Sequence, residues 1–304
     1  MDHPLLQNEN SSLRKRVIQL LKSGYNIKSS GNIVFVCGGN DATHMRPRFC
    51  EYCAINYPDI MIFWPEYAMA DYFSAPSIIS FDISDFEELV SEVSHSIILF
   101  PEAPGSFAET GYFSALNHIA LKTILVLDLN RQASDSFISM GPAKKIGSSS
   151  QFSGVMQTPY DTPAFGDIIA RLNRVSMPKN KKILQLDKFS TLKSYDKFCL
   201  IYACVKILAA ATLNDILYVF RSIFKSHISE PNIKQLTSIL VGAKYLVETG
   251  SYGHLRTSDT KTPLAEIRDG KKAEEAEIKL MLANAYMDSD PEFLEIIEEA
   301  EHAS

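Results

Sequence analysis

Apolar positions along this chain fall into short continuous runs that alternate with helix-spaced patterns. The runs expected to be strands lie at 32–37, 60–64, 97–100 and 122–128. Continuous apolar runs of this length are typical of strands buried on both faces. Segments 43–56 and 84–94 lie between them and carry helical spacing. The alternation predicts an α/β fold, a Rossmann-like parallel sheet with helices on both faces.

The pattern changes on either side of this region. A helix at 13–21 precedes the first strand, and Gly, Ser, Pro and Lys at 141–163 indicate surface loops rather than another sheet layer. Helices expected at 195–211, 213–224 and 231–244 come before a Gly-punctuated hairpin at 245–256. We therefore predict a catalytic-type α/β domain at 1–180. A smaller, mainly helical, winged-helix-like domain with an acidic tail is expected at 181–304.

The most informative stretch is Ile97–Phe113, where a buried strand runs into Pro-Glu-Ala-Pro-Gly-Ser and then into a helix. The first amides of a helix have no internal partner, so this turn can hold an anionic or sugar ligand. Glu109 is expected in the first helical turn, beside that ligand. Ser106-Phe-Ala-Glu109 also fits a capping box that only starts a helix, and this alternative stays open.

Further candidates lie where the expected strands end, because ligands of open parallel sheets bind beyond the carboxyl ends of the strands. The candidate substrate-binding residues are Cys37, Gly38, Gly39, Asn40, Trp64, Glu66, Asp71, Pro101, Glu102, Gly105 and Ser106. Arg46 and Arg48 follow the Gly38-Gly39 turn. They could neutralise a pyrophosphate or lie on a solvated helix face.

Composition narrows the class of protein. The 304 residues are 46% hydrophobic, as in an ordinary globular protein of about two domains. No stretch reaches the ~18 apolar residues of a membrane span, and residues 1–10 lack the core of a signal peptide, so we expect a cytoplasmic protein. The five cysteines are expected to be reduced thiols, and no metal site is predicted from their spacing.

Charge is unevenly distributed. Residues 1–155 carry 11 Lys and Arg against 16 Asp and Glu, whereas residues 156–285 carry 19 against 13. A basic region of this kind favours a polyanionic partner, although three helices and a hairpin could equally bind protein. The candidate nucleic-acid contacts are Lys225, His227, Lys234, Lys244, His254 and Arg256.

These motifs resemble the nucleoside deoxyribosyltransferase-like proteins, and within them the effector (toxin) subunits encoded beside bacterial retrons. The resemblance rests on the segments Val34–Gly39, Ile62–Glu66, Ile97–Phe113 and Ser136–Pro142, and it extends over nearly the whole chain. The third segment is specific, whereas the others are weak alone.

The resemblance implies an N-glycosidase of antiviral defence in which Glu109 is the nucleophile or stabiliser at the anomeric carbon. It points to NAD as substrate rather than cofactor, and to a reverse transcriptase with its msDNA, an RNA–DNA hybrid product, as the partner that restrains the toxin. It also implies a homo-oligomer or a larger assembly with that partner.

Two departures keep alternatives open. Ala103 and Pro104 stand where the transferases carry an extra Asp, with Glu102 displaced, which puts free deoxyribosyl transfer in doubt. Hydrolysis or transfer on other (deoxy)nucleosides or nucleotides is one alternative. Another is a non-catalytic nucleotide sensor, because Pro104–Glu109 also resembles the loop of lysine-decarboxylase-like Rossmannoid domains.

Overall fold

The computed structural model describes residues 3–28, 33–58, 60–63, 83–131, 135–175, 181–249, 253–259 and 263–289. The chain divides into two compact units. Residues 30–65 and 81–178 belong to an α/β unit, whereas residues 1–29 and 179–304 belong to a mainly helical unit. No helix among the described residues has the length and apolar character needed to cross a bilayer.

The α/β unit is built on a five-stranded parallel sheet in the order β3-β2-β4-β5-β6. Its strands are β2 (Ile33–Cys37), β3 (Met61–Phe63), β4 (Ser96–Leu99), β5 (Thr123–Asp128) and β6 (Val155–Thr158). The strand order reverses between β2 and β4. The predicted Rossmann-like α/β class is confirmed.

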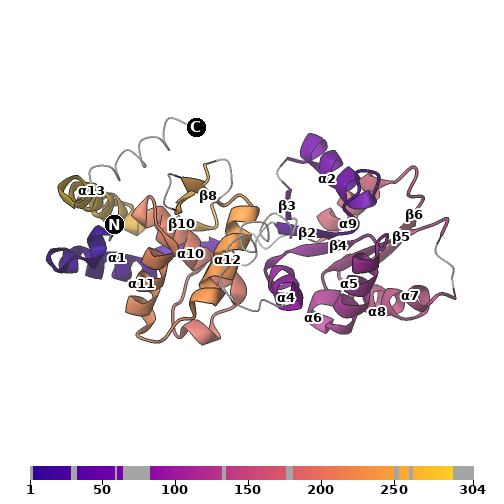
Figure 1. The fold of residues 1–304 in the computed structure, drawn as a ribbon, viewed down its shortest axis with the longest axis horizontal. Coiled ribbons are helices and arrows are strands. Elements are labelled where there is room, and N and C mark those ends of the chain that lie inside the picture. The colour runs from indigo at the N-terminus through magenta and orange to yellow at the C-terminus, as the bar shows by residue number, and fades with distance from the viewer. Residues whose placement is uncertain are drawn as a thin grey trace. The chain divides into compact units, whose positions relative to one another are not determined.

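Helices cover both faces of this sheet. They are α2 (Met45–Asn56), α4 (Ile83–Val93), α5 (Pro104–Ala115), α6 (Asn117–Ala120), α7 (Phe137–Met140), α8 (Pro142–Ser149) and α9 (Phe165–Arg174). Figure 1 shows α2 and α9 on one face and α4, α5, α6 and α8 on the other. Val34 and Val36 pack in the α2/α9 core. Because strand residues alternate between faces, Phe35 and Cys37 point toward α4 and α5.

The expectation that 141–163 forms only surface loops is wrong. The segment contains α8 and the edge strand β6. Pro142 stands at the first position of α8, where its missing N–H costs nothing. The strand was missed because it has four residues with alternating burial, not a continuous apolar run.

The second unit is mainly helical. Its helices are α1 (Ser11–Ser23), α10 (Ser194–Leu208), α11 (Leu213–Phe224), α12 (Glu230–Gly242) and α13 (Lys272–Ser289), with 3-10 turns η1 (Pro4–Leu6), η2 (Asn8–Asn10), η3 (Phe189–Thr191) and η4 (Asp269–Lys271). Its strands are β1 (Tyr25–Lys28), β7 (Lys181–Ile183), β8 (Leu246–Thr249), β9 (His254–Thr257) and β10 (Ala265–Ile267).

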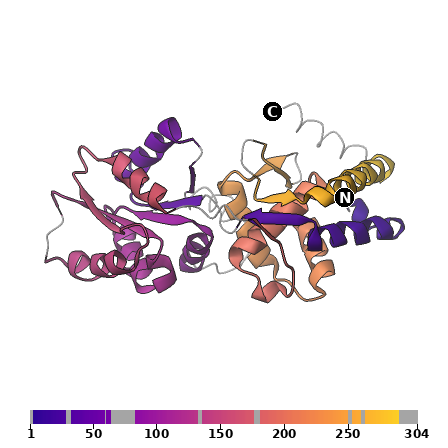
Figure 2. The ribbon, with the colours of Figure 1, turned by 180° about the vertical axis from the view of Figure 1, so that it is seen from behind.

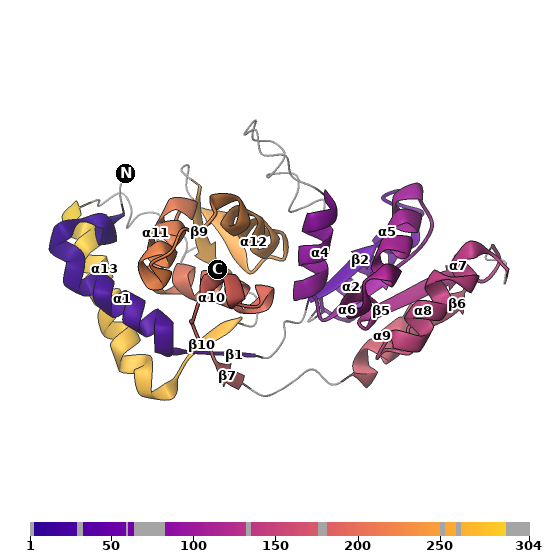
Figure 3. The same cartoon turned by 90° about the horizontal axis from the view of Figure 1, so that it is seen from below.

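The N-terminal residues belong with this second unit and not, as predicted, with a domain spanning 1–180. Strand β1 lies between β10 and β7 in a three-stranded antiparallel sheet, which Figure 2 shows from behind. Helix α1 lies beside α13 (Figure 3), where Arg16 and Glu277 form an ion pair at 2.7 Å. Local patterns predict helix α1 correctly, but Glu277, the partner of Arg16, lies 261 residues later in the chain, and no local pattern indicates this contact.

Helices α10, α11 and α12 are followed by the antiparallel pair β8–β9, in the order expected for a winged helix. Thr212 and Asp215 cap α11 reciprocally, since Asp215 Oδ2 accepts the Thr212 N–H at 2.8 Å and Thr212 Oγ1 accepts the Asp215 N–H at 3.3 Å. The assignment of this unit as winged-helix-like stays a prediction.

A buried histidine ties the N-terminus to this unit. His3 Nδ1 accepts the Leu5 N–H at 3.1 Å, and its Nε2 lies 2.7 Å from the Tyr286 hydroxyl, which donates to the Leu208 carbonyl at 3.0 Å. This pattern requires a neutral imidazole with its proton on Nε2. Burial lowers the His3 pKa to about 4; Asp215 opposes this shift and His254 adds to it.

We expect this histidine to make the stability of the unit depend on pH. The folded-state pKa lies below the unfolded one, so the contribution is complete above the unfolded pKa and is lost as pH falls through about 4. The shift corresponds to about 3 kcal/mol. Urea unfolding of the full chain at several pH values should show this loss of the free energy of unfolding. In His3→Gln the dependence of that free energy on pH should be smaller by a similar amount. An unchanged profile in the variant would contradict the assignment.

Candidate functional site

The candidate site lies at the switch point of the parallel sheet. Strand β2 ends at Cys37 and is followed by Gly38-Gly39, whereas β4 ends at Leu99 and is followed by Pro101–Ala103. These neighbouring strands are the pair at which the order reverses. In open α/β sheets ligands bind beyond the strand ends at such a point.

Helix α5 brings Glu109 to the end of β2. Phe113 packs on Phe35 with ring centroids 6.1 Å apart. Glu109 lies one helical turn before Phe113, and Cys37 lies two residues after Phe35. Helix α5 is a crossover helix and runs antiparallel to β2. One helical turn, about 5.4 Å, is close to the length of two strand residues. Glu109 therefore meets Cys37 as Phe113 meets Phe35. The Cys37 thiol and the Glu109 carboxylate are hydrogen-bonded.

The start of α5 differs from the capping box considered for Ser106 and Glu109. The helix begins at Pro104, so Ser106 is its third residue and Glu109 lies in the second turn, not the first. Ser106 Oγ accepts the N–H groups of Glu102 and Ala103, each at 3.0 Å, and donates to the Ala103 carbonyl at 2.9 Å. Ser106 therefore caps the start of α5. The Glu109 carboxylate is directed toward Cys37.

Charged side chains surround the Cys37 thiol. Burial raises its pKa well above the usual range, Glu109 and Glu87 raise it further, and Arg46 lowers it. Arg46 is only 3% exposed, although guanidinium groups are rarely buried unless they are paired. Glu109 is half-buried, with Oε2 shielded from solvent. We refer to Cys37, Arg46, Glu87 and Glu109 as the carboxylate cluster.

Glu87 was not among the predicted site residues. It lies on α4 three positions before Val90, which is fully buried, so both residues share the face toward the sheet. The sequence feature that could have indicated Glu87 is a glutamate on the apolar face of an amphipathic helix.

Glu102 is engaged by the main chain. Its Oε1 accepts the N–H groups of Gly39 at 3.0 Å and Arg46 at 3.3 Å, and Oε2 accepts the Met45 N–H at 2.7 Å. The carboxylate thus satisfies the first amides of α2, a place expected for a substrate group.

The structure places the other predicted substrate-binding residues as follows. Gly38 and Gly39 form the tight turn after β2, where a Cβ on Gly38 would lie 2.8 Å from Glu102 Oε1 and one on Gly39 2.1 Å from His44 Nδ1. Asn40 and Gly105 are exposed, and Pro101 is buried. Trp64, Glu66 and Asp71 lie outside the described residues.

Neither arginine of α2 lies simply on a solvated face. Arg46 is in the carboxylate cluster, and Arg48 donates to the carbonyls of Tyr160 at 2.6 Å and Asp161 at 3.3 Å. Arg48 therefore supports the loop after β6.

The candidate nucleic-acid contacts lie before, within and after α12. Lys225 and His227 are exposed before its start, and Lys244 is exposed after its end. The 13 residues of α12 separate these groups by roughly 20 Å. Lys234, His254 and Arg256 are partly buried, and Arg256 pairs with Asp259 at 3.5 Å. The exposed contacts would follow an extended strip.

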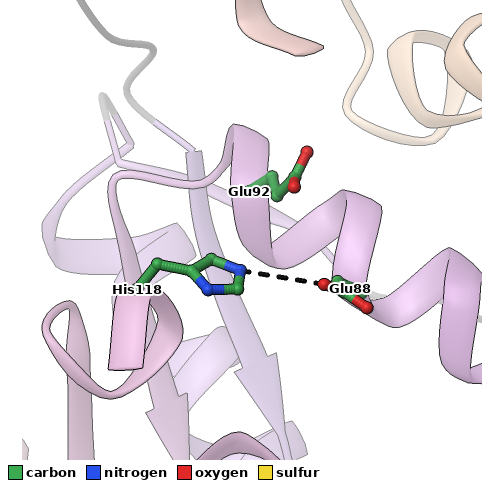
Figure 4. Close-up of side chains that lie close together, drawn as sticks. All are labelled: Glu88, Glu92 and His118. Atoms are coloured by element: carbon green, nitrogen blue, oxygen red, sulfur yellow. Dashed lines mark ion pairs between the residues drawn. The ribbon is translucent and has the colours of Figure 1, made fainter. Parts of the chain in front are cut away.

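A second group of titratable side chains lies on the surface of the α/β unit. His118 Nε2 is 3.8 Å from Glu88 Oε1, and Glu92 lies one turn along α4 from Glu88 (Figure 4). The three ligand-type atoms lie within 4.8 Å of one another. The Tyr112 hydroxyl donates to Glu88 at 3.1 Å, so these contacts join α4 to α5 and α6.

Comparison with known proteins gives two matches. Residues 42–248 match the family model described as STM3845 retron effector protein. A 123-residue segment is 34% identical to an Escherichia coli protein described as "Retron Ec86 putative ribosyltransferase/DNA-binding protein". That alignment covers 40% of this chain and 38% of the relative, so the chain spans about two-fifths of the relative's length.

Proposed function

This chain belongs to the STM3845 retron effector family, and on that premise we propose that it is an anti-phage toxin that cleaves the N-glycosidic bond of NAD and releases nicotinamide. The observation that supports this activity best is the carboxylate of Glu109, directed to the end of β2 at the sheet's switch point.

The proposed reaction suits the groups at the site. The bond between C1′ and the pyridinium nitrogen breaks, and its electron pair neutralises the departing nicotinamide, so the leaving group needs no proton. The ribose becomes oxocarbenium-like, and the negative Glu109 stabilises or traps it. Water then completes hydrolysis at C1′ and gives up one proton, which Glu87 can accept as general base.

The remaining members of the carboxylate cluster position Glu109. The Cys37 thiol holds one side of the carboxylate by hydrogen bonding, and Arg46 supplies positive charge that favours the ionised form. These are positioning roles.

Other nucleosides stay as the alternative substrates, by hydrolysis or by transfer. A neutral purine or pyrimidine leaves more readily when an acid protonates it. Glu102 carries a carboxyl group close to the end of β2, but its oxygens accept backbone N–H groups. This arrangement favours a base that departs without a proton. A non-catalytic nucleotide sensor is the remaining alternative.

Purified full-length protein incubated with NAD and a nucleoside panel tests the activity. We expect release of nicotinamide and ADP-ribose, and chromatography measures both products. An added acceptor base distinguishes transfer from hydrolysis. Binding of NAD without turnover would favour the sensor.

Glu87→Gln should reduce the rate of nicotinamide release about 10²-fold or more, because a general base typically contributes 10²–10⁴-fold. Adding a strong nucleophile such as azide should restore part of the rate, since it needs no deprotonation. Glu88→Gln, at the neighbouring surface position, is the matched control. Equal rates in the two variants would exclude this role.

We further propose that a retron reverse transcriptase with its msDNA restrains the toxin and that the helical unit contacts this polyanion. The exposed groups Lys225, His227 and Lys244 supply positive charge. The relative's name includes DNA binding. Assembly as a homo-oligomer or with the reverse transcriptase is part of this proposal, and light scattering of the chain alone and with its partner tests it.

Binding to an RNA–DNA hybrid oligonucleotide should weaken steeply with salt, because each neutralised phosphate releases counterions. The double variant Lys225→Ala/Lys244→Ala should lower the slope of log affinity against log salt by about two. Lys144→Ala, an exposed lysine of the α/β unit, is the control. A slope unchanged by the double variant would contradict these contacts.

A further inference from the structure

The turn between β2 and α2 carries an anion of the protein's own. Three backbone N–H groups, those of Gly39, Met45 and Arg46, converge on the Glu102 carboxylate at 2.7–3.3 Å. Amides after the first strand and at the start of its helix are the groups that bind substrate phosphate in many nucleotide-binding α/β proteins. Here a side chain occupies that position.

Glu102 is fixed from both sides. Its own N–H donates to Ser106 Oγ at 3.0 Å, which anchors the residue to the start of α5. Its Oε1 lies so close to Gly38 that a Cβ there would approach to 2.8 Å. The residue therefore links the end of β4 to the start of α2 beside the carboxylate cluster.

We propose that Glu102 determines specificity by holding the phosphate position of the β2–α2 turn, so that the pyrophosphate of the proposed substrate binds elsewhere in the site. The turn adjoins Cys37, whose pKa is influenced by Glu87, Glu109 and Arg46, and the Arg46 N–H donates to Glu102. A phosphate brought against the occupied turn would meet repulsion from Glu102. A positively charged base such as a pyridinium would be attracted.

A thermal-unfolding experiment on the full chain tests the occupied anion position without relying on catalysis. Glu102→Ala leaves three amides exposed, and inorganic phosphate should fill the gap. We expect the variant to lose several degrees of Tm in chloride and to regain at least half of that loss in phosphate at equal ionic strength. The wild type and Glu51→Ala, at an exposed position of α2, should show little phosphate dependence.

Two results would overturn this part of the proposal. One is a variant that gains no more from phosphate than from chloride, and the other is a wild type that gains as much as the variant. If Glu102→Ala does not fold in chloride, its refolding in phosphate decides. Recovery of the folded variant in phosphate supports the proposal, and failure of the variant to fold in both salts contradicts it. Glu102→Gln keeps the side-chain length and should show a smaller phosphate response.

A kinetic comparison tests the specificity, which rests on the proposed function. Glu102→Ala should raise the ratio of kcat/KM for nicotinamide mononucleotide to kcat/KM for nicotinamide riboside about tenfold above the wild-type ratio, because the freed amides can bind the 5′-phosphate. An unchanged ratio contradicts the specificity role. Failure of the wild type to cleave NAD would count against the proposed function, whereas the phosphate response would still decide the anion position.

Discussion

Glu109→Gln should abolish nicotinamide release, with kcat falling by roughly 10³-fold or more, which corresponds to about 4 kcal/mol of transition-state stabilisation. The amide keeps the size of the side chain but removes the negative charge that the oxocarbenium-like transition state needs. The measurement is single-turnover cleavage of NAD, accompanied by cell survival on expression of the chain without its partner.

The control for this substitution is Glu88→Gln, which removes a surface carboxylate of the same unit that pairs with His118. Loss of one exposed ion pair costs at most about 1 kcal/mol of stability, so this variant should retain cleavage and toxicity. Thermal unfolding should show that Glu109→Gln is folded. Full toxicity of folded Glu109→Gln would refute the role of Glu109.

The sequence was sufficient for four strands of the parallel sheet and for the strand–loop–helix that carries Glu109, because these depend on local patterns, whereas the role of Glu109 stays a prediction. Buried strands appear as apolar runs, and the strand–loop–helix around Pro104 and Gly105 places the glutamate at the sheet edge. The capping box placed the first helical residue at Phe107, three residues after the observed start at Pro104, because Pro104 can take the first helical position as well as a loop position.

The partners of Glu109 could not be predicted in the same way. Glu87 and Arg46 approach Cys37 only because α4 and α2 pack against β2, and residue patterns do not state which helix faces meet. Glu102 is a clearer example, since the amides that it binds lie 56–63 residues earlier in the chain. Within the loop sequence it could be a substrate ligand, an acid or a cap, and only the non-local contact distinguishes them.

Arg46→Met should disturb both the stability and the pH dependence of the α/β unit. The side chain is 3% exposed and is the cation of the carboxylate cluster, so its loss removes the positive charge that accompanies Glu87 and Glu109 near Cys37. Removing one partner of a buried charged group costs about 3–5 kcal/mol. We expect a Tm loss of several degrees or more.

The catalytic consequence follows from the same electrostatics. Without the guanidinium, the site loses the positive charge that favours ionised carboxylates. Because the ionised form supports cleavage, the acid limb of kcat/KM against pH should move upward. At a sufficiently alkaline pH much of the rate should return, which a purely structural defect would not produce.

Arg48→Met provides the matched comparison on the same helix. Arg48 binds the carbonyls of Tyr160 and Asp161, so its loss should lower stability modestly through two hydrogen bonds. The acid limb should stay in place because Arg48 is outside the carboxylate cluster. Identical pH profiles for the two arginine variants would show that Arg46 supports packing alone, and an upward shift confined to Arg46→Met would show that its charge keeps Glu109 ionised.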